Sequence, residues 1–139
     1  MLQEYLDKML AITLRIEPHL IGPAPAGTAE LAQARAEQAR TITAYQLYVH
    51  REIFEPMIRN GSPVQIGRAR AMKVECIMLA EDFRAFARLW NVDNALDQWP
   101  VYQSAALALR DRIRAHVDHV RKEGAFWSVA PVQRSATRF

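Results

Sequence analysis

Apolar residues recur at spacings of three and four along most of the chain, the pattern of helices that pack one face against a partner. In the first segment, residues 2–17, the repeat consists of Leu2, Leu6, Met9, Thr13 and Ile16. Pro18 disfavours continuation of this helix, and residues 21–28 form a connector without helical pattern. Thr28 predicts the N-cap of the next helix.

The second segment reaches residue 59 with one proline and no glycine, so it predicts a single long helix. Its apolar seam consists of Leu31, Gln38, Ile42, Tyr45, Val49, Ile53 and Pro56. Asn60 and Gly61 predict a left-handed stop. Ser62, Pro63 and Gln65 then predict a helix restart, with serine as the cap, proline at the first position and glutamine reaching back.

Two further helices are predicted. The third runs from there to about Trp90, on a seam of Ala69, Met72, Cys76, Ala80, Phe83, Ala87 and Trp90. Asp97 or Asn94 is the expected cap of the fourth helix, Pro100 lies in its first turn, and Gly124 is the expected stop. Its seam consists of Tyr102, Ala106, Leu109, Ile113, His116 and Val120.

The pattern contains no alternation of strand type, so the predicted fold is all-α. Amphipathic helices joined by short turns pack best as an up-down-up-down antiparallel four-helix bundle. We expect one bundle domain over residues 1–127 and a C-terminal tail over residues 128–139.

Composition narrows the class of protein. The chain has 139 residues, of which 50% are hydrophobic and 24% charged, as expected for a single soluble globular domain. It has no apolar run of the roughly 18 residues that a membrane span needs and no secretory signal pattern. A lone cysteine, Cys76, cannot form an internal disulfide. These features predict a cytoplasmic protein that does not bind membranes.

Charge and motifs exclude further classes. The net charge is +3, and the basic residues between 110 and 122 are interrupted by Asp111 and Asp118, so nucleic-acid binding is not predicted. The chain has no nucleophile elbow, phosphate-cradling glycine loop, HExxH or CxxC motif. We therefore expect a protein that is not an enzyme.

Three stretches resemble the hemerythrin-like (HHE cation-binding) family: IFEPMI at 53–58, NGSP at 60–63 and AEDFRAFARLW at 80–90. The resemblance extends over about residues 2–127. In that family the second and fourth helices each carry a His-x-x-x-Glu pair, and the bundle holds a di-iron centre. The resemblance implies the hemerythrin-like fold. It places Gln46 and His50 at the second-helix ligand positions, His119 and Glu123 at those of the fourth helix, and Cys76 near the third-helix histidine.

The candidate metal ligands are Gln46, His50, His116, His119 and Glu123. Residues three or four apart share a helix face, and imidazole with carboxylate suits iron, zinc, copper or nickel. At about 100° per residue, Gln46, His50 and Glu123 fall at the margins of the packed stripes and His119 points further out. Only His116 lies on a seam, which predicts a hydrogen-bonded core histidine.

Three functions follow. The first is a non-catalytic sensor, regulatory or interaction module without a cofactor, whose metal site is reduced or lost. The second is a protein that binds iron or another divalent metal through the nonstandard ligand set and carries or senses oxygen, nitric oxide or iron.

The third is a homodimer or protein-binding module. Tyr48, Phe54, Phe86 and Leu89 point away from the narrow seams and would form its apolar patch. The alternative for these four residues is that the buried stripes are wider than the seams.

Overall fold

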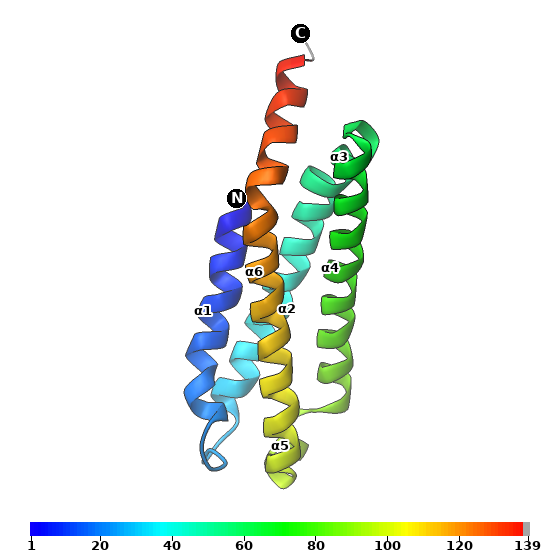
Figure 1. Cartoon of the computed structure of the whole chain (residues 1–139). Helices are drawn as coiled ribbons and strands as arrows, with labels where there is room; N and C mark the ends of the chain where they lie inside the picture. Colours follow the sequence, from blue (N-terminus) through cyan, green and yellow to red (C-terminus); the bar gives the residue numbers. More distant parts are fainter. Residues whose placement is uncertain (138–139) are drawn as a thin grey trace.

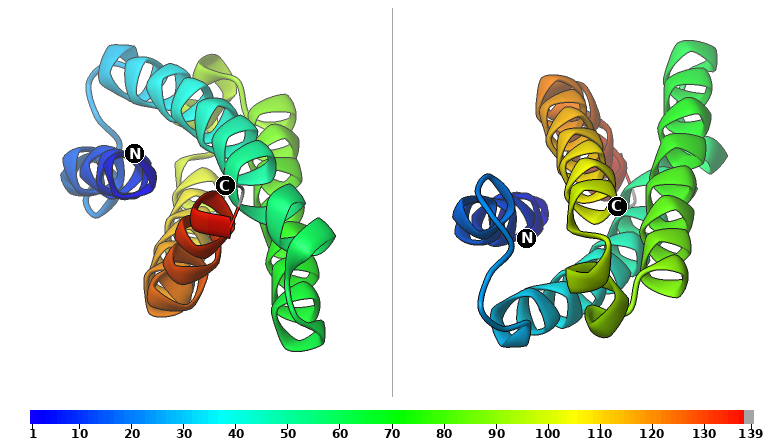
Figure 2. Two further views of the ribbon diagram at one scale, coloured as in Figure 1. Left: turned by 90° about the horizontal axis from the view of Figure 1, so that it is seen from above. Right: turned by 90° about the horizontal axis from the view of Figure 1, so that it is seen from below.

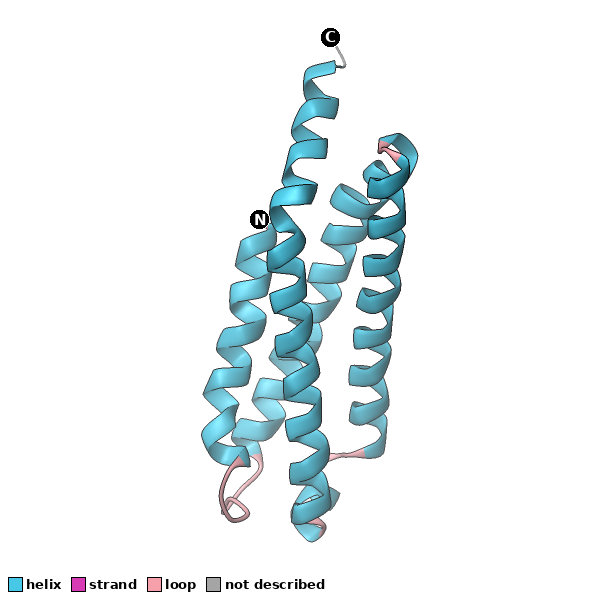
Figure 3. Ribbon diagram, in the orientation of Figure 1, coloured by secondary structure: helices cyan, strands magenta, loops and turns pink. Residues whose placement is uncertain are grey.

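The computed structural model describes the backbone of residues 1–137 and the side chains of residues 1–91 and 94–124. The described backbone consists of helices joined by short loops and contains no strand (Figures 1 and 3). The elements are α1 (Leu2–Leu20), α2 (Ala29–Val49), the π-helical segment η1 (His50–Phe54), α3 (Glu55–Asn60), α4 (Pro63–Leu89), α5 (Val92–Asp97) and α6 (Trp99–Thr137). None of the helices, over the part described, combines the length and apolarity needed to cross a bilayer.

The long helices alternate in direction along the bundle. α1 and α4 run in one direction. α6 runs in the opposite direction, as does α2, which continues into α3 (Figure 1). Contacts link α1 with α2, α2 and α3 with α4, α4 with α6, and α6 with α1. The end-on views show α1 and α4 on opposite sides (Figure 2). The predicted all-α antiparallel bundle is confirmed.

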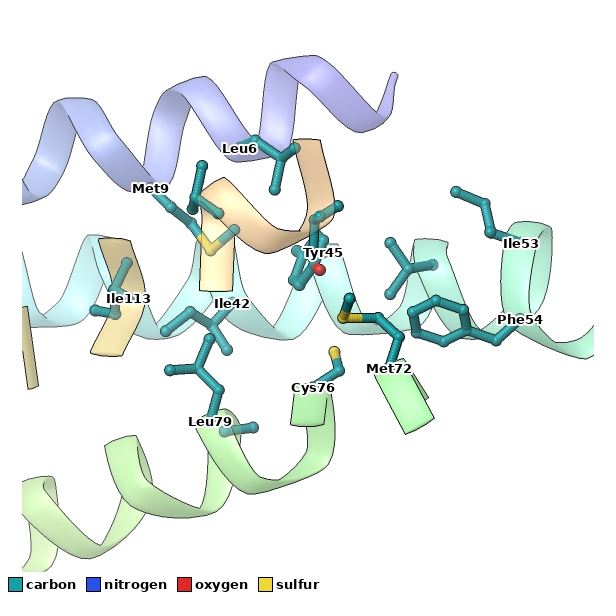
Figure 4. Close-up of a cluster of buried hydrophobic side chains, with 14 of the residues drawn as sticks. Leu6, Met9, Ile42, Tyr45, Ile53, Phe54, Met72, Cys76, Leu79 and Ile113 are labelled. Atoms are coloured by element: carbon teal, nitrogen blue, oxygen red, sulfur yellow. The ribbon is translucent and has the colours of Figure 1, made fainter. Parts of the chain in front are cut away.

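The predicted seams face the interior. Every seam position of the second and fourth predicted helices is buried, and Val117 joins them. Only Leu2, Ile16 and Ala87, at the margins, are half-buried. The side chains of one large cluster fill the space between helices (Figure 4). Each fully buried aliphatic or aromatic side chain contributes about 1.5–3 kcal/mol, so this burial is the main stabilising term.

The buried stripes are wider than the narrow seams. Phe54 is only 1% exposed, and Tyr48 and Phe86 pack against the core. Leu89, at 68% exposed, is the one member of the predicted apolar patch that faces solvent. The patch predicted for a dimer is therefore wrong, and the wider-stripe alternative is correct, as is usual for globular helices.

The predicted second helix contains a π-helical turn. The backbone N–H of Glu55 donates to the carbonyl of His50, five residues back. Pro56 explains the turn, because it has no N–H and in an α-helix its ring would clash with the carbonyl of Glu52. Widening the ladder by one residue avoids that clash and leaves both Phe54 and Pro56 buried.

The first two helices differ from prediction at their ends. α1 continues through Pro18 to Leu20, whose side chain is buried with Leu31 and Trp90 in a second apolar cluster. Burial of Leu20 outweighs the local preference against helix before proline. Thr28 occupies the N-cap position of α2, yet its side chain makes no capping hydrogen bond.

The turn between α3 and α4 forms as predicted, with a different glycine conformation. Gly61 has φ −81° and ψ 173°, which is extended and not left-handed. Glycine is needed there because a Cβ would lie 2.6 Å from the Met57 carbonyl oxygen. Ser62 and Gln65 form the predicted capping box, since the Ser62 hydroxyl accepts from the Gln65 N–H and the Gln65 side chain accepts from the Ser62 N–H.

The last predicted helix has different ends. Asn94 and Asp97 lie inside the short helix α5 and do not cap α6, and the Asn91 side chain accepts from the Asn94 N–H instead. Gly124 does not end α6, which continues to Thr137 and includes residues 128–137. Glycine lowers helix stability without forcing a stop. α6 rises beyond the other helices (Figure 1).

We predict that Ser62→Ala lowers the free energy of unfolding by about 1 kcal/mol, because it removes one half of the capping box. Urea denaturation followed by circular dichroism measures the change. The matched control is Ser104→Ala on the exposed face of α6, where alanine has the better helix propensity and should cost nothing. Equal effects of the two substitutions would show that the cap does not stabilise the turn.

Candidate functional site

A chain of hydrogen-bonded polar side chains crosses the bundle from its core to its surface. The hydroxyl of Tyr45 on α2 lies 2.7 Å from Nε2 of His116 on α6. Nδ1 of His116 lies 2.6 Å from one carboxylate oxygen of Glu75 on α4, and Nδ1 of His119 lies 2.8 Å from the other. Three helices thus contribute to one network.

The exposure of the side chains rises steeply along this network, from Tyr45 to His119. Tyr45 is fully buried and His116 is 3% exposed, whereas the side chain of His119 is 51% exposed. Glu75 lies between them and is half-buried. Near the surface, Glu75, His116 and His119 line an open depression together with Met78 and other residues of α4 and α6.

The carboxylate fixes the direction of the hydrogen bonds. An ionised carboxylate only accepts, so Nδ1–H of His116 donates to Glu75 and Nε2 is left as the acceptor for the Tyr45 hydroxyl. This is the neutral tautomer. Burial lowers the pKa of His116, and the hydrogen bond and charge of Glu75 oppose that shift only in part. Both ring nitrogens are satisfied, as a buried imidazole requires.

Cys76 and Gln46 extend the network at its inner end. Tyr45 and Cys76 point into the same interior space (Figure 4), and the thiol lies within hydrogen-bonding reach of the Tyr45 hydroxyl. The Gln46 side-chain amide donates to the Cys76 carbonyl at 3.1 Å. Burial raises the pKa of the Cys76 thiol to about 11, so the sulfur is protonated and weakly nucleophilic at neutral pH.

Burial also raises the pKa of Tyr45, which stays a neutral hydroxyl. The network therefore holds no activated nucleophile. What it does provide is an unbroken path of hydrogen bonds from an exposed imidazole to a buried phenol and thiol. Such a path can pass a proton between surface and core, and it couples the positions of α2, α4 and α6.

The structure divides the predicted metal ligands between separate places. His116 and His119 meet at Glu75. Gln46 and His50 line a different open depression with Glu55, and Glu123 pairs with Arg68 at 3.4 Å. Within the described residues, no group of three or more His, Cys, Asp or Glu side chains is arranged to hold a metal ion.

His50 is half-buried at the π turn. Its ring packs edge-on against Phe54 at 5.4 Å between ring centroids, and its buried Nε2 has no hydrogen-bond partner. Burial lowers the pKa of His50, and the nearby Lys73 ammonium lowers it further. The expected marginal position of His50 is confirmed, and so is the burial of His116 on a seam.

Sequence reasoning missed the central residues of this network. Tyr45 reads as an ordinary seam position, and Glu75 lies one residue before the seam position Cys76. The available signal was an acid beside a buried seam position, on a helix expected to run antiparallel to the one that carries His116. Whether Glu75 meets His116 depends on how far α4 is shifted along its axis relative to α6, and only the structure shows this.

Comparison with protein-family models, with curated proteins and with solved structures gives no match for this chain. The resemblance to hemerythrin-like proteins therefore remains a prediction from the sequence. The class that the fold defines is an all-α antiparallel helical bundle with a polar network in its core.

We predict that Tyr45→Phe lowers the free energy of unfolding by about 1–3 kcal/mol, because it leaves Nε2 of His116 buried without a partner. Tyr48→Phe on the same helix is the control. The Tyr48 hydroxyl forms no hydrogen bond with the described part of the chain, so removing this hydroxyl should cost less than about 0.5 kcal/mol. Urea denaturation measures both. A Tyr45→Phe variant as stable as the wild type would contradict the network.

We also predict a pH dependence that originates at His116. Its folded-state pKa lies below the ordinary 6.5, so below about pH 6.5 the unfolded chain takes up a proton that the folded chain refuses. The free energy of unfolding is then fully retained above that pH and falls as pH decreases toward the lowered pKa. Denaturant titrations between about pH 7.5 and 5.5 follow this.

His116→Gln should flatten that pH dependence, while His119→Gln, which leaves the buried imidazole in place, should keep it. His50 also has a lowered pKa, so His50→Gln is combined with each variant to remove its contribution. An unchanged slope in the His50→Gln/His116→Gln variant would show that His116 is not the source.

Proposed function

We propose that this chain is a non-catalytic, hemerythrin-like helical bundle that acts as a sensor, regulatory or interaction module. Its metal site is reduced or lost, and a hydrogen-bonded network of protein groups takes its place. The all-α antiparallel arrangement supports the scaffold part of the proposal. The stretches at 53–58, 60–63 and 80–90, which resemble that family, support it further.

The observation that carries the proposal is the content of the bundle centre. Tyr45, His116 and Cys76 form hydrogen bonds with protein groups there, among the methionines Met9 and Met72. A di-iron centre needs several carboxylates and imidazoles converging on two ions. Among the described side chains the fully buried imidazole is that of His116, and its two nitrogens already have protein partners.

The network supports a regulatory role because it joins surface and core. A partner or ligand in the depression beside His119 that drew Glu75 away would leave buried Nδ1 of His116 without its carboxylate. An unsatisfied buried donor costs about 1–3 kcal/mol. Occupancy of the depression is thereby coupled to the packing of α4 against α6, which a neighbouring protein can recognise.

The alternative function is binding of iron or another divalent metal, to sense oxygen, nitric oxide or iron. One observation favours it: two imidazoles, His116 and His119, converge on the single carboxylate of Glu75. Both would have to release Glu75 and turn toward an ion. His50, Glu123 and Gln46 lie elsewhere and would not complete that set.

We predict that protein purified without an affinity tag carries far less than one iron per chain by elemental analysis. Anaerobic loading with ferrous iron followed by exposure to air should add no near-ultraviolet band to the absorption of the tryptophans and tyrosines. Near-stoichiometric iron that is lost on His119→Gln or Glu75→Gln would overturn the proposal and favour the alternative. Arg112→Gln, at the rim of the same depression, is the control for a general surface effect.

A further inference from the structure

The depression between α4 and α6 contains a carboxylate that no cation neutralises. The side chain of Glu75 is 38% exposed there, and its two oxygens accept from the imidazoles of His116 and His119 at 2.6 and 2.8 Å. Among the described residues, no lysine or arginine forms an ion pair with Glu75. An ionised carboxylate has about four acceptor sites, so about two remain unused.

The other charged groups of the depression neutralise each other. Asp82 and Arg112 both line it, and the Arg112 guanidinium donates to the Asp82 carboxylate at 3.1 Å. With both imidazoles neutral, the depression keeps one negative charge, and that charge lies on Glu75. Because Glu75 is partly exposed, a cation from outside can approach it without unfolding any helix.

The surroundings of this carboxylate are apolar. Val74 and Met78 line the depression from α4 although they are 56% and 59% exposed, and Ala115 lines it from α6. Val74 and Met78 are four residues apart, so they are neighbours on one helix face, and the flexible methionine adapts to different apolar groups. The depression has a volume of about 540 Å³, which lies within the range of small-molecule sites.

We propose that this depression binds a primary alkylammonium ion, which is a protonated amine with a short hydrocarbon tail. One ammonium N–H donates to an unused acceptor site of the Glu75 carboxylate. A second donates to Nε2 of His119, which is the acceptor nitrogen of that neutral ring because Nδ1–H donates to Glu75. The third donates to water, and the tail lies against Val74 and Met78.

An ammonium group fits these acceptors better than a metal ion does. Within the described residues, no third His, Cys, Asp or Glu side chain is arranged with Glu75 and His119 to complete a coordination shell. An ammonium needs only hydrogen-bond acceptors, and water supplies the missing one. The inference names a ligand for the depression and rests on the proposed function for the consequence of binding, whereas binding itself is tested directly.

The test is an NMR titration of the full chain with n-butylammonium chloride at about pH 7.5, where an ordinary histidine is neutral and an alkylamine is protonated. We expect one-site saturation with a Kd on the order of 1 mM, since the ligand is small and the site is open. The shifted amides should be those of α4 and α6 around the depression.

Three related compounds test the chemistry of recognition. Butan-1-ol, which has no charge, and butyrate, which has the opposite charge, should show no saturable binding. Butyltrimethylammonium, which has the charge without an N–H donor, should bind about tenfold more weakly. Equal binding of all four compounds would overturn the assignment of Glu75 and His119 as acceptors.

Glu75→Gln should abolish saturable binding, because it removes the charge while its amide oxygen can still accept from His116. The matched control is Glu81→Gln, which changes an exposed carboxylate of the same helix that pairs with Arg84 outside the depression. It should bind normally. Met78→Ser, at an exposed position that folding does not depend on, should weaken butylammonium about threefold and leave methylammonium unchanged.

Failure of this inference and failure of the proposed function give different results. No saturable shift at tens of millimolar butylammonium with folded wild-type protein, or undiminished binding by Glu75→Gln, overturns the inference. Binding that leaves the ring-nitrogen shifts of His116 unchanged supports the inference and removes the coupling between surface and core that the proposed function uses. Binding that changes those shifts supports both.

Discussion

The relative placement of α2, α4 and α6 depends on the need to satisfy both nitrogens of an imidazole that is buried among apolar side chains. His116 has no solvent to supply hydrogen bonds, so one partner must come from α2 and the other from α4. Apolar packing alone tolerates small rotations of helices against one another. A hydrogen bond of 2.6 or 2.7 Å does not, and the two bonds at His116 therefore fix the relative rotation of three helices.

The two halves of the bundle treat polar groups differently. Both ring nitrogens of His116 have protein partners, and the surrounding apolar side chains form one buried cluster. Around Gln38 and Arg35 a pocket remains, and polar atoms on the same helix are left without partners. Natural cores rarely carry such atoms unless something else satisfies them. The ring of His116 is thus satisfied by protein groups, whereas Gln38 and Arg35 keep buried polar atoms without partners.

Helix existence and the buried faces could be predicted from the sequence, because the three-and-four spacing directly reports which side of a helix is apolar. The capping box at Ser62 was readable for the same reason, since its residues are neighbours in the chain. Features that depend on a balance between local conformational preference and tertiary packing could not be predicted from the sequence. The passage of α1 through Pro18 depends on burial of Leu20, and that of α6 through Gly124 shows that glycine alone is a weak stop. The contact between Glu75 and His116 could not be predicted, because it depends on how far α4 is shifted along its axis relative to α6.

The π turn at His50–Phe54 has a consequence for how the chain tolerates length changes. Each residue of a helix advances the side-chain direction by about 100°, so an insertion or deletion elsewhere in α2 would turn everything beyond it out of phase with the core. The π turn already contains one surplus residue. Loss of that residue would return the ladder to ordinary α geometry, but Pro56 would then face the carbonyl that the wider turn avoids. Pro56 thus keeps the surplus residue in the helix. The surplus residue in turn sets the direction in which Met57 and the following turn face.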